Sequence, residues 1–196
     1  MVAIPDNTPA EVRAKLEVAA LKKDVGDQAF KAGDLKAALR GYHESLLYLQ
    51  GIDKSGLKSA LSPPSADGSL PQQKTAADEM MEKIYANMSA CHIKQENWKR
   101  AVETADKALS KNDTNYKAVF RKAKALGELG FFERAEPLLE DLIKKSPSDA
   151  PAATAELARL RAMDKERDRA HKQKLKGWLN RDKKTTPVEP HAGAQS

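Results

Sequence analysis

The chain has 196 residues, 40% of them hydrophobic and only 5% aromatic, which suits one domain with a modest core. Its net charge is +6, but a basic surplus of that size lies within residues 161–184, so the remainder is neutral overall. No apolar run is long enough for a signal peptide or a membrane span, so we expect a cytoplasmic protein, with the nucleus as a second location.

The first predicted hairpin occupies residues 9–50, after a disordered stretch at 1–8. The Thr8 hydroxyl can cap the amide of the third helical residue, and the proline that follows suits the first helical position. Gly33 ends this helix, because a left-handed cap favours a residue without a Cβ. The second helix is predicted from Leu35 to Leu49, with one apolar face formed by Ala38, Leu39, Tyr42, Leu46 and Leu49.

Residues 51–72 are predicted to form a loop insert between the first and second hairpins. The stretch is rich in serine, proline and glycine, and Pro63-Pro64 is incompatible with a continuing helix. Long loops of this kind are uncommon in compact domains, and we expect this one to be mobile.

The second hairpin is predicted at 72–111. Its first helix begins between Gln72 and Ala77 and continues to Lys94, and Asn97 caps a partner helix that ends near Ser110. The third hairpin is predicted at 114–146, with helices at 115–130 and 132–145. Pro137 falls in the first turns of the last of these helices, where proline is tolerated.

A long charged helix is predicted at 149–180, followed by a disordered tail at 181–196, which has no apolar periodicity. In the first half of this helix, the apolar residues have the spacing needed to cover the open face of the last hairpin. They are Ala153, Leu157, Leu160 and Met163.

The second and third hairpins repeat one pattern 34 residues apart. Ala101, Ala105 and Ala108 recur as Ala135, Leu139 and Leu142, and Asn87 recurs as Arg121. This period is typical of tetratricopeptide repeats, helix pairs that bury their apolar faces only against a neighbouring pair. The pattern predicts an all-α right-handed superhelix of three such hairpins with a long C-terminal capping helix. The first helix of each hairpin, helix A, would line a concave groove suited to peptides.

Five polar side chains on the three A helices are candidates for peptide binding. Lys117 and Arg121 lie one turn apart on the same predicted face. Lysine offers a mobile point charge and arginine a planar fork, so the pair suits carboxylates. Asn87 can both donate and accept hydrogen bonds. Lys23 and Asp27 come from the first hairpin, so all three hairpins contribute polar side chains to one wall of the predicted groove.

Three motifs on these helices resemble the carboxylate-clamp subclass of tetratricopeptide domains, which occurs in co-chaperones and large immunophilins. Lys23-Asp24-Val25-Gly26-Asp27 is similar to its Lys-x-x-Gly-Asn motif. Asn87 precedes small residues as in the second motif, and Asn115-Tyr116-Lys117-Ala118-Val119-Phe120-Arg121 matches Asn-x-Lys-Ala-x-x-Arg. The resemblance implies a monomeric, non-enzymatic adaptor that binds the acidic C-terminal tail of the ninety-kilodalton or seventy-kilodalton heat-shock chaperone.

The order of segments also resembles that of the tetratricopeptide repeat protein 9 family, through the insert after the first hairpin and the basic terminal helix.

Asp27 departs from the clamp motif, which has an asparagine at this position. The resemblance implies that this asparagine would hydrogen-bond the ligand's terminal carboxylate. Two like charges about 4 Å apart repel by up to about 4 kcal/mol at an effective dielectric constant near 20. Asp27 could also pair with Lys23. It therefore either weakens the clamp or redirects it to another ligand.

Two other binding functions are consistent with the sequence. The basic helix with Trp178 could bind another protein partner while the groove stays idle, or residues 161–184 could contact nucleic acid. The four histidines are scattered, and no phosphate loop or catalytic constellation occurs, so no cofactor, metal or enzymatic activity is expected. The single cysteine, Cys91, excludes an internal disulfide and is expected to be a small buried side chain.

Overall fold

The computed structural model describes residues 10–54 and 75–182, with no side chains described for 51, 53, 54 or 180–182. The expectations for residues 1–8, for the Thr8 cap, for insert residues 55–72 and for the tail from 183 lie outside the described residues.

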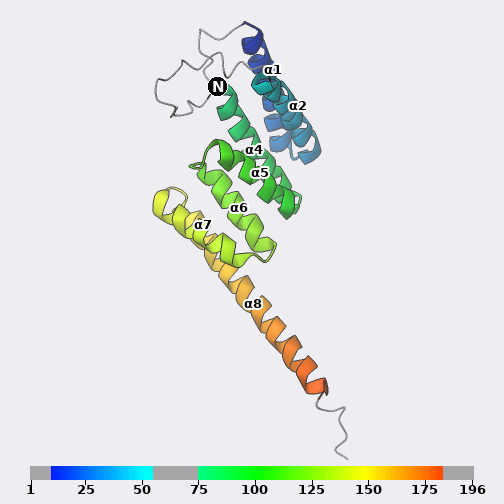
Figure 1. Cartoon of the computed structure of the whole chain (residues 1–196), viewed down its shortest axis with the longest axis vertical. Helices are drawn as coiled ribbons and strands as arrows, with labels where there is room; N and C mark the ends of the chain where they lie inside the picture. Colours follow the sequence, from blue (N-terminus) through cyan, green and yellow to red (C-terminus); the bar gives the residue numbers. More distant parts are fainter. Residues whose placement is uncertain (1–9, 55–74, 183–196) are drawn as a thin grey trace, which may run out of the picture.

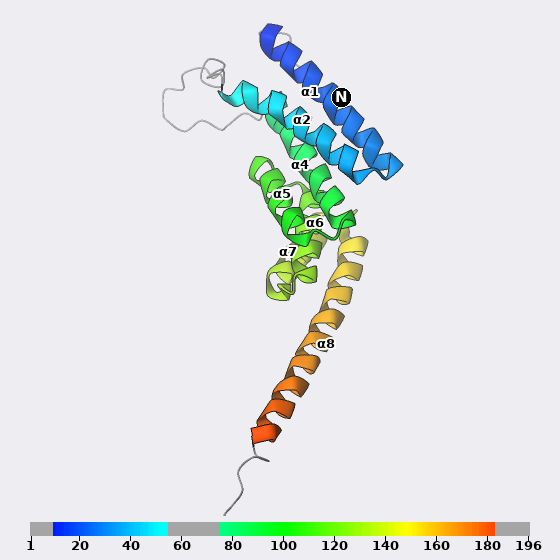
Figure 2. The ribbon, with the colours of Figure 1, turned by 90° about the vertical axis from the view of Figure 1, so that its right-hand side faces the viewer.

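Within the described residues the fold is entirely helical, and the helices follow one another as antiparallel hairpins (Figure 1). The first hairpin is α1 (Ala10–Ala32) with α2 (Leu35–Lys54), the second α4 (Ala76–Lys94) with α5 (Trp98–Lys111), and the third α6 (Tyr116–Glu128) with α7 (Phe132–Lys145). Helix α8 (Ala150–Asp182) completes the stack, and its distal half extends beyond the body (Figure 2). The predicted all-α superhelix is confirmed.

Two core clusters hold the stack together. In the first, Tyr42 and Leu49 of α2 pack with Ile84 of α4 and with apolar residues of α1, so the first two hairpins share one core. The second joins α6, α7 and the start of α8. The alanines that recur with the 34-residue period are fully buried, and a smaller cluster of alanines from α4, α5 and α6 lies at the second junction. Small side chains let these helices approach closely.

The turn inside each hairpin uses one left-handed residue at the same place in the repeat. Gly33 has φ 84°, Gly130 has φ 86°, and the equivalent residue of the second hairpin, Glu96, has φ 56°. The predicted Asn97 cap is also present, since Asn97 Oδ1 accepts a hydrogen bond from the amide of Arg100. The turns of the second and third hairpins are therefore 34 residues apart, the same spacing as the core alanines, and the first turn has the same left-handed geometry.

Two helices extend beyond their predicted ends. Helix α2 continues to Lys54, so the first four residues of the predicted insert at 51–72 are helical. Ile52 explains the difference, because its side chain is buried against the first core cluster and stabilises an additional helical turn. Helix α8 ends at Asp182, two residues past the predicted end.

Helix α8 covers α6 and α7 through its first half. Ala153, Leu157 and Leu160 are buried in the second core cluster. A Cβ added at Gly127 of α6 would lie 2.3 Å from Leu160 Cδ2, so the glycine makes room for the leucine. Within the described part of the chain, no helix is both long and apolar enough to cross a bilayer.

Candidate functional site

The five predicted binding residues lie on three helices that contact one another in sequence. Helices α1, α4 and α6 are the A helices of the three hairpins, and α4 contacts both of the others. We call this set of helices the A-helix wall. It brings Lys23, Asp27 and Asn87 into direct contact, while Lys117 and Arg121 follow on α6.

Asp27 is the centre of a hydrogen-bonded cluster. Its Oδ2 accepts from Lys23 Nζ at 2.5 Å, one turn earlier on α1. Its Oδ1 accepts from the Tyr42 hydroxyl at 2.7 Å and from Asn87 Nδ2 at 2.9 Å. We call these four residues the Asp27 cluster. The bond to Asn87 joins the first hairpin to the second.

Tyr42 belongs to this cluster because α1 and α2 cross at glycines. A Cβ on Gly26 would lie 2.8 Å from the Tyr42 ring, so the bare backbone lets the ring lie against α1. The Tyr42 hydroxyl then reaches Asp27, the next residue along α1. The sequence predicted Tyr42 only as a core residue. The signal for a polar role was the phenol itself, because a buried tyrosine hydroxyl usually has a hydrogen-bond partner.

The Asp27 cluster keeps its carboxylate ionised. Burial disfavours the charge, but hydrogen bonds from Lys23, Tyr42 and Asn87, with the Lys23 charge, outweigh it and lower the Asp27 pKa below its usual value. Burial and the adjacent carboxylate both raise the pKa of Tyr42, which therefore remains a neutral donor. Asp27 is thus a fixed negative charge on the A-helix wall.

Arg121 differs from Lys23 because it has no carboxylate partner among residues 10–54 and 75–182. The side chain is half-buried, and Nη1 donates to the Ala86 carbonyl of α4 at 2.6 Å. Burial lowers the pKa of its guanidinium, and no ion pair to Arg121 is present within the described residues. A partly desolvated cation without a counter-ion is costly, so this position favours an anion from outside.

Lys117 lies one turn before Arg121 and is exposed, again with no ion pair in the part of the chain described. The contrast with its neighbour on α6 is informative, because Lys122 Nζ lies 2.6 Å from Asp106 Oδ1. Asn115 of the same motif is occupied, since its side-chain amide donates to Glu82 at 2.8 Å. Within the described residues, Lys117 and Arg121 are therefore both left available for a ligand.

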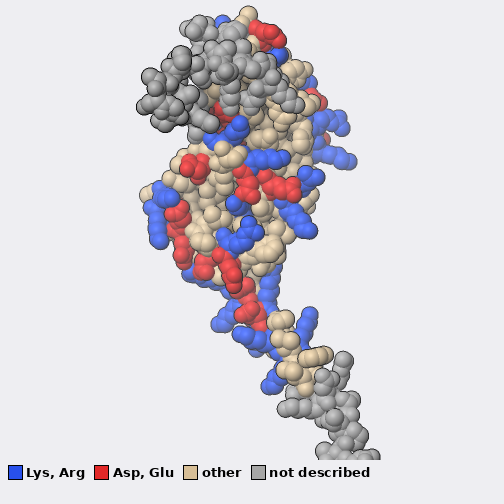
Figure 3. Space-filling view, viewed as in Figure 1, with Lys and Arg blue, Asp and Glu red and all other residues tan. Residues whose placement is uncertain are grey.

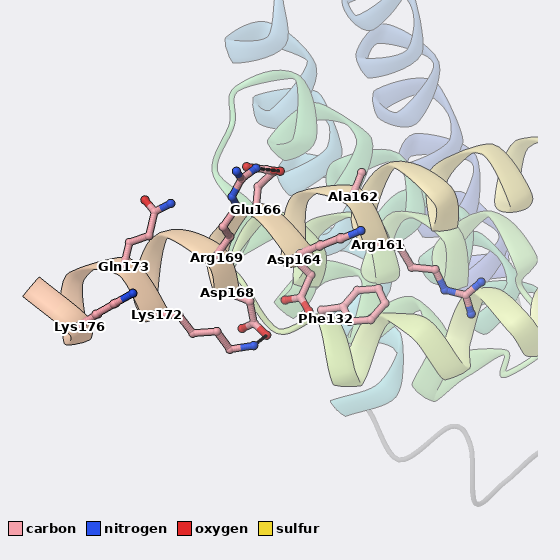
Figure 4. Close-up of a pocket in the computed structure, with 11 residues that line it drawn as sticks. Phe132, Arg161, Ala162, Asp164, Glu166, Asp168, Arg169, Lys172, Gln173 and Lys176 are labelled. Carbon is pink, nitrogen blue, oxygen red and sulfur yellow. Dashed lines mark ion pairs between the residues drawn. The ribbon is translucent and has the colours of Figure 1, made fainter.

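On the face seen in Figure 3, charge is mixed over the helical body, and lysines and arginines are frequent along the part of α8 that extends beyond it. A hollow of about 870 Å³ runs along α8, beside Phe132 of α7 (Figure 4). It is open, and its charged lining includes the pairs Arg169–Glu166 and Lys172–Asp168. None of the five candidate residues lines it, so it is separate from the A-helix wall.

Cys91 lies one turn after Asn87 and is fully buried, and burial raises its pKa to about 11. Because the thiolate is the reactive form, we expect alkylation by iodoacetamide at neutral pH to be at least about tenfold slower in the folded than in the urea-unfolded protein. Mass spectrometry measures the labelled fraction, and this single cysteine gives an unambiguous signal. Equal rates in both states would contradict a buried, protonated thiol.

Comparison with known proteins identifies the repeat type. Residues 92–160 match the family model described as tetratricopeptide repeat. Over 125 residues, 64% of this chain, the sequence is 26% identical to FK506-binding protein 5 of Rhizopus delemar. The chain spans only 29% of that relative, so it corresponds to a minor part of it.

Two solved structures show a similar fold. The Hsp90 co-chaperone Cns1 from Saccharomyces cerevisiae has a TM-score of 0.64 and 21% identity, covering 89% of this chain and 54% of that one. The second TPR domain of human RPAP3, in complex with HSP70 peptide SGPTIEEVD, has a TM-score of 0.53 and 20% identity, covering 76% and 98% respectively. The chain therefore has a superhelical fold of the tetratricopeptide type.

Proposed function

We propose that this tetratricopeptide-repeat protein is a non-enzymatic co-chaperone adaptor that binds an acidic peptide on its A-helix wall. The peptide is the C-terminal tail of the ninety-kilodalton or seventy-kilodalton heat-shock chaperone. One observation carries the proposal: Arg121 is a half-buried guanidinium without a carboxylate partner in the described residues, and the unpaired Lys117 lies one turn away.

Carboxylates of the peptide would supply the missing negative charge. The fork of Arg121 can take one carboxylate with two parallel hydrogen bonds, and Lys117 can take a second as a mobile point charge. A hydrogen bond to a charged group contributes about 1.5–3 kcal/mol, and the partly desolvated guanidinium favours the upper part of that range.

The relatives support the same class of partner. One similar structure is named as an Hsp90 co-chaperone and another was solved with an HSP70 peptide. We extend this by proposing that the chain belongs to the carboxylate-clamp subclass and, from its order of segments, to the tetratricopeptide repeat protein 9 family. A monomer located in the cytoplasm, with the nucleus as the alternative, would meet these chaperone tails.

The test is calorimetric titration with the peptide acetyl-Met-Glu-Glu-Val-Asp. We expect Lys117→Ala and Arg121→Ala each to weaken binding by at least about tenfold, or roughly 1.4 kcal/mol. Lys122→Ala is the matched control, because Lys122 lies on the same helix but is paired with Asp106, and its affinity should stay within about twofold of the parent. Unchanged affinity in both Lys117→Ala and Arg121→Ala would contradict the proposal.

A second candidate function uses the distal half of α8. Leu175, Trp178 and Leu179 are exposed there among basic side chains, which suits a scaffold that holds a different protein partner. Nucleic-acid contact through the same segment is a weaker form of this candidate, and its affinity would fall steeply with salt. The variant Trp178→Ser would weaken either of these contacts and leave titration of the acidic peptide unchanged.

A further inference from the structure

We propose that Asp27 is a built-in substitute for a ligand carboxylate. It occupies the donors of Lys23 and Asn87, so the A-helix wall holds an acidic peptide by its side-chain carboxylates at α6 and does not require a free C-terminal carboxylate. The inference rests on the proposed function, because it takes an acidic peptide as the occupant.

The first argument is that Asp27 already accepts hydrogen bonds from three donors of this chain. Lys23, Asn87 and Tyr42 all donate to it, at 2.5, 2.9 and 2.7 Å. The Tyr42 side chain that carries the hydroxyl is fully buried. If the carboxylate swung away, this buried hydroxyl would lose its acceptor, which is unfavourable. The carboxylate is therefore a permanent occupant of the wall.

The second argument is electrostatic. A foreign carboxylate within hydrogen-bonding distance of Lys23 and Asn87 would lie beside the Asp27 charge, and like charges at such a separation repel. The positive charge of Lys23 is already balanced by Asp27. The α1–α4 end of the wall is therefore closed to a second anion.

The remaining groups suit an uncharged part of a peptide. Among the described residues the Asn87 amide oxygen accepts no hydrogen bond, and the Lys23 ammonium retains N–H groups not used by Asp27. These groups match main-chain carbonyl and amide groups. Lys117 and Arg121, without carboxylate partners in the described chain, are left to bind the acidic side chains.

This division predicts a specificity. Acidic segments should bind whether they end in a free acid or in an amide, and acidic segments inside a longer chain should bind as well. Of the two outcomes that the sequence leaves open for Asp27, the structure therefore favours redirection over simple weakening.

The test compares acetyl-Met-Glu-Glu-Val-Asp with its C-terminal amide by calorimetry. For the parent protein we expect affinities within about twofold of each other. For Asp27→Asn, which removes the charge but keeps an acceptor for Tyr42, the free acid should bind at least about fivefold more tightly than the amide. Asp24→Asn is the matched control, since Asp24 is exposed on the same helix and outside the Asp27 cluster, and its ratio should equal that of the parent.

A parent protein that binds the acid at least about fivefold more tightly than the amide would overturn this inference, and this measurement depends on no variant. An unchanged ratio in a folded Asp27→Asn protein would also overturn it. Failure of the proposed function appears differently: neither peptide binds the parent, or Lys117→Ala and Arg121→Ala bind both peptides as the parent does.

Discussion

Replacing Leu160 with alanine is expected to lower the free energy of unfolding by about 2–5 kcal/mol. Leu160 is only 1% exposed and belongs to the core cluster that α8 forms with α6 and α7. Its side chain fills the space above Gly127, where even a Cβ would lie only 2.3 Å from Leu160 Cδ2. Truncation would leave a cavity where the capping helix joins the last hairpin.

Urea unfolding followed by circular dichroism measures this loss. Leu179→Ala is the control on the same helix, because Leu179 is 56% exposed and its truncation should change the free energy by at most about 0.5 kcal/mol. Similar losses in the two variants would mean that α8 does not cap the stack through Leu160.

Gly41→Ala is expected to lower the free energy of unfolding by about 1–3 kcal/mol through overpacking. An added Cβ would lie 2.9 Å from the Gly26 nitrogen and 3.1 Å from the Lys22 carbonyl oxygen. These are backbone atoms of α1, so the helices themselves must separate. The same shift would move Asp27 away from the Tyr42 hydroxyl.

Gly177→Ala is the matched control for Gly41→Ala. Gly177 also lies in a helix, but nothing is within 4 Å of an added Cβ. Because alanine is a better helix former by about 0.8–1.0 kcal/mol, this variant should be as stable as the parent or more stable. The same urea titration compares them, and a Gly41→Ala protein as stable as Gly177→Ala would show that α1 and α2 can separate at little cost.

The repeat architecture could be predicted because it depends on local spacing. The alanines of α5 recur 34 residues later in α7 as Ala135, Leu139 and Leu142, and this spacing reflects a constraint within one hairpin or its nearest neighbour. The end of α2 could not be predicted in the same way. Gly51 and the polar residues around it indicate a turn, whereas Ile52 continues the helix through a tertiary contact with the first core cluster.

The sequence predicted which residues form the candidate site better than it predicted the hydrogen bonds between them. The Lys23–Asp27 pair is local, four residues apart, and was considered from the sequence. The bonds from Tyr42 and Asn87 to Asp27 join residues 15 and 60 positions apart, and they depend on how α1 packs against α2 and α4. No spacing rule contains that information. The presence of an acidic residue was therefore visible, but its role as an acceptor for three side chains was not.

The bonds across the repeat junctions limit how small a working fragment could be. Asn87 reaches back from α4 to Asp27, and Arg121 reaches back from α6 to the Ala86 carbonyl, so α4 and α6 are each bonded to the A helix before them. No isolated hairpin contains both partners of either bond. A graft intended to transplant this recognition surface onto another scaffold must therefore carry the chain from α1 through α6 as one block.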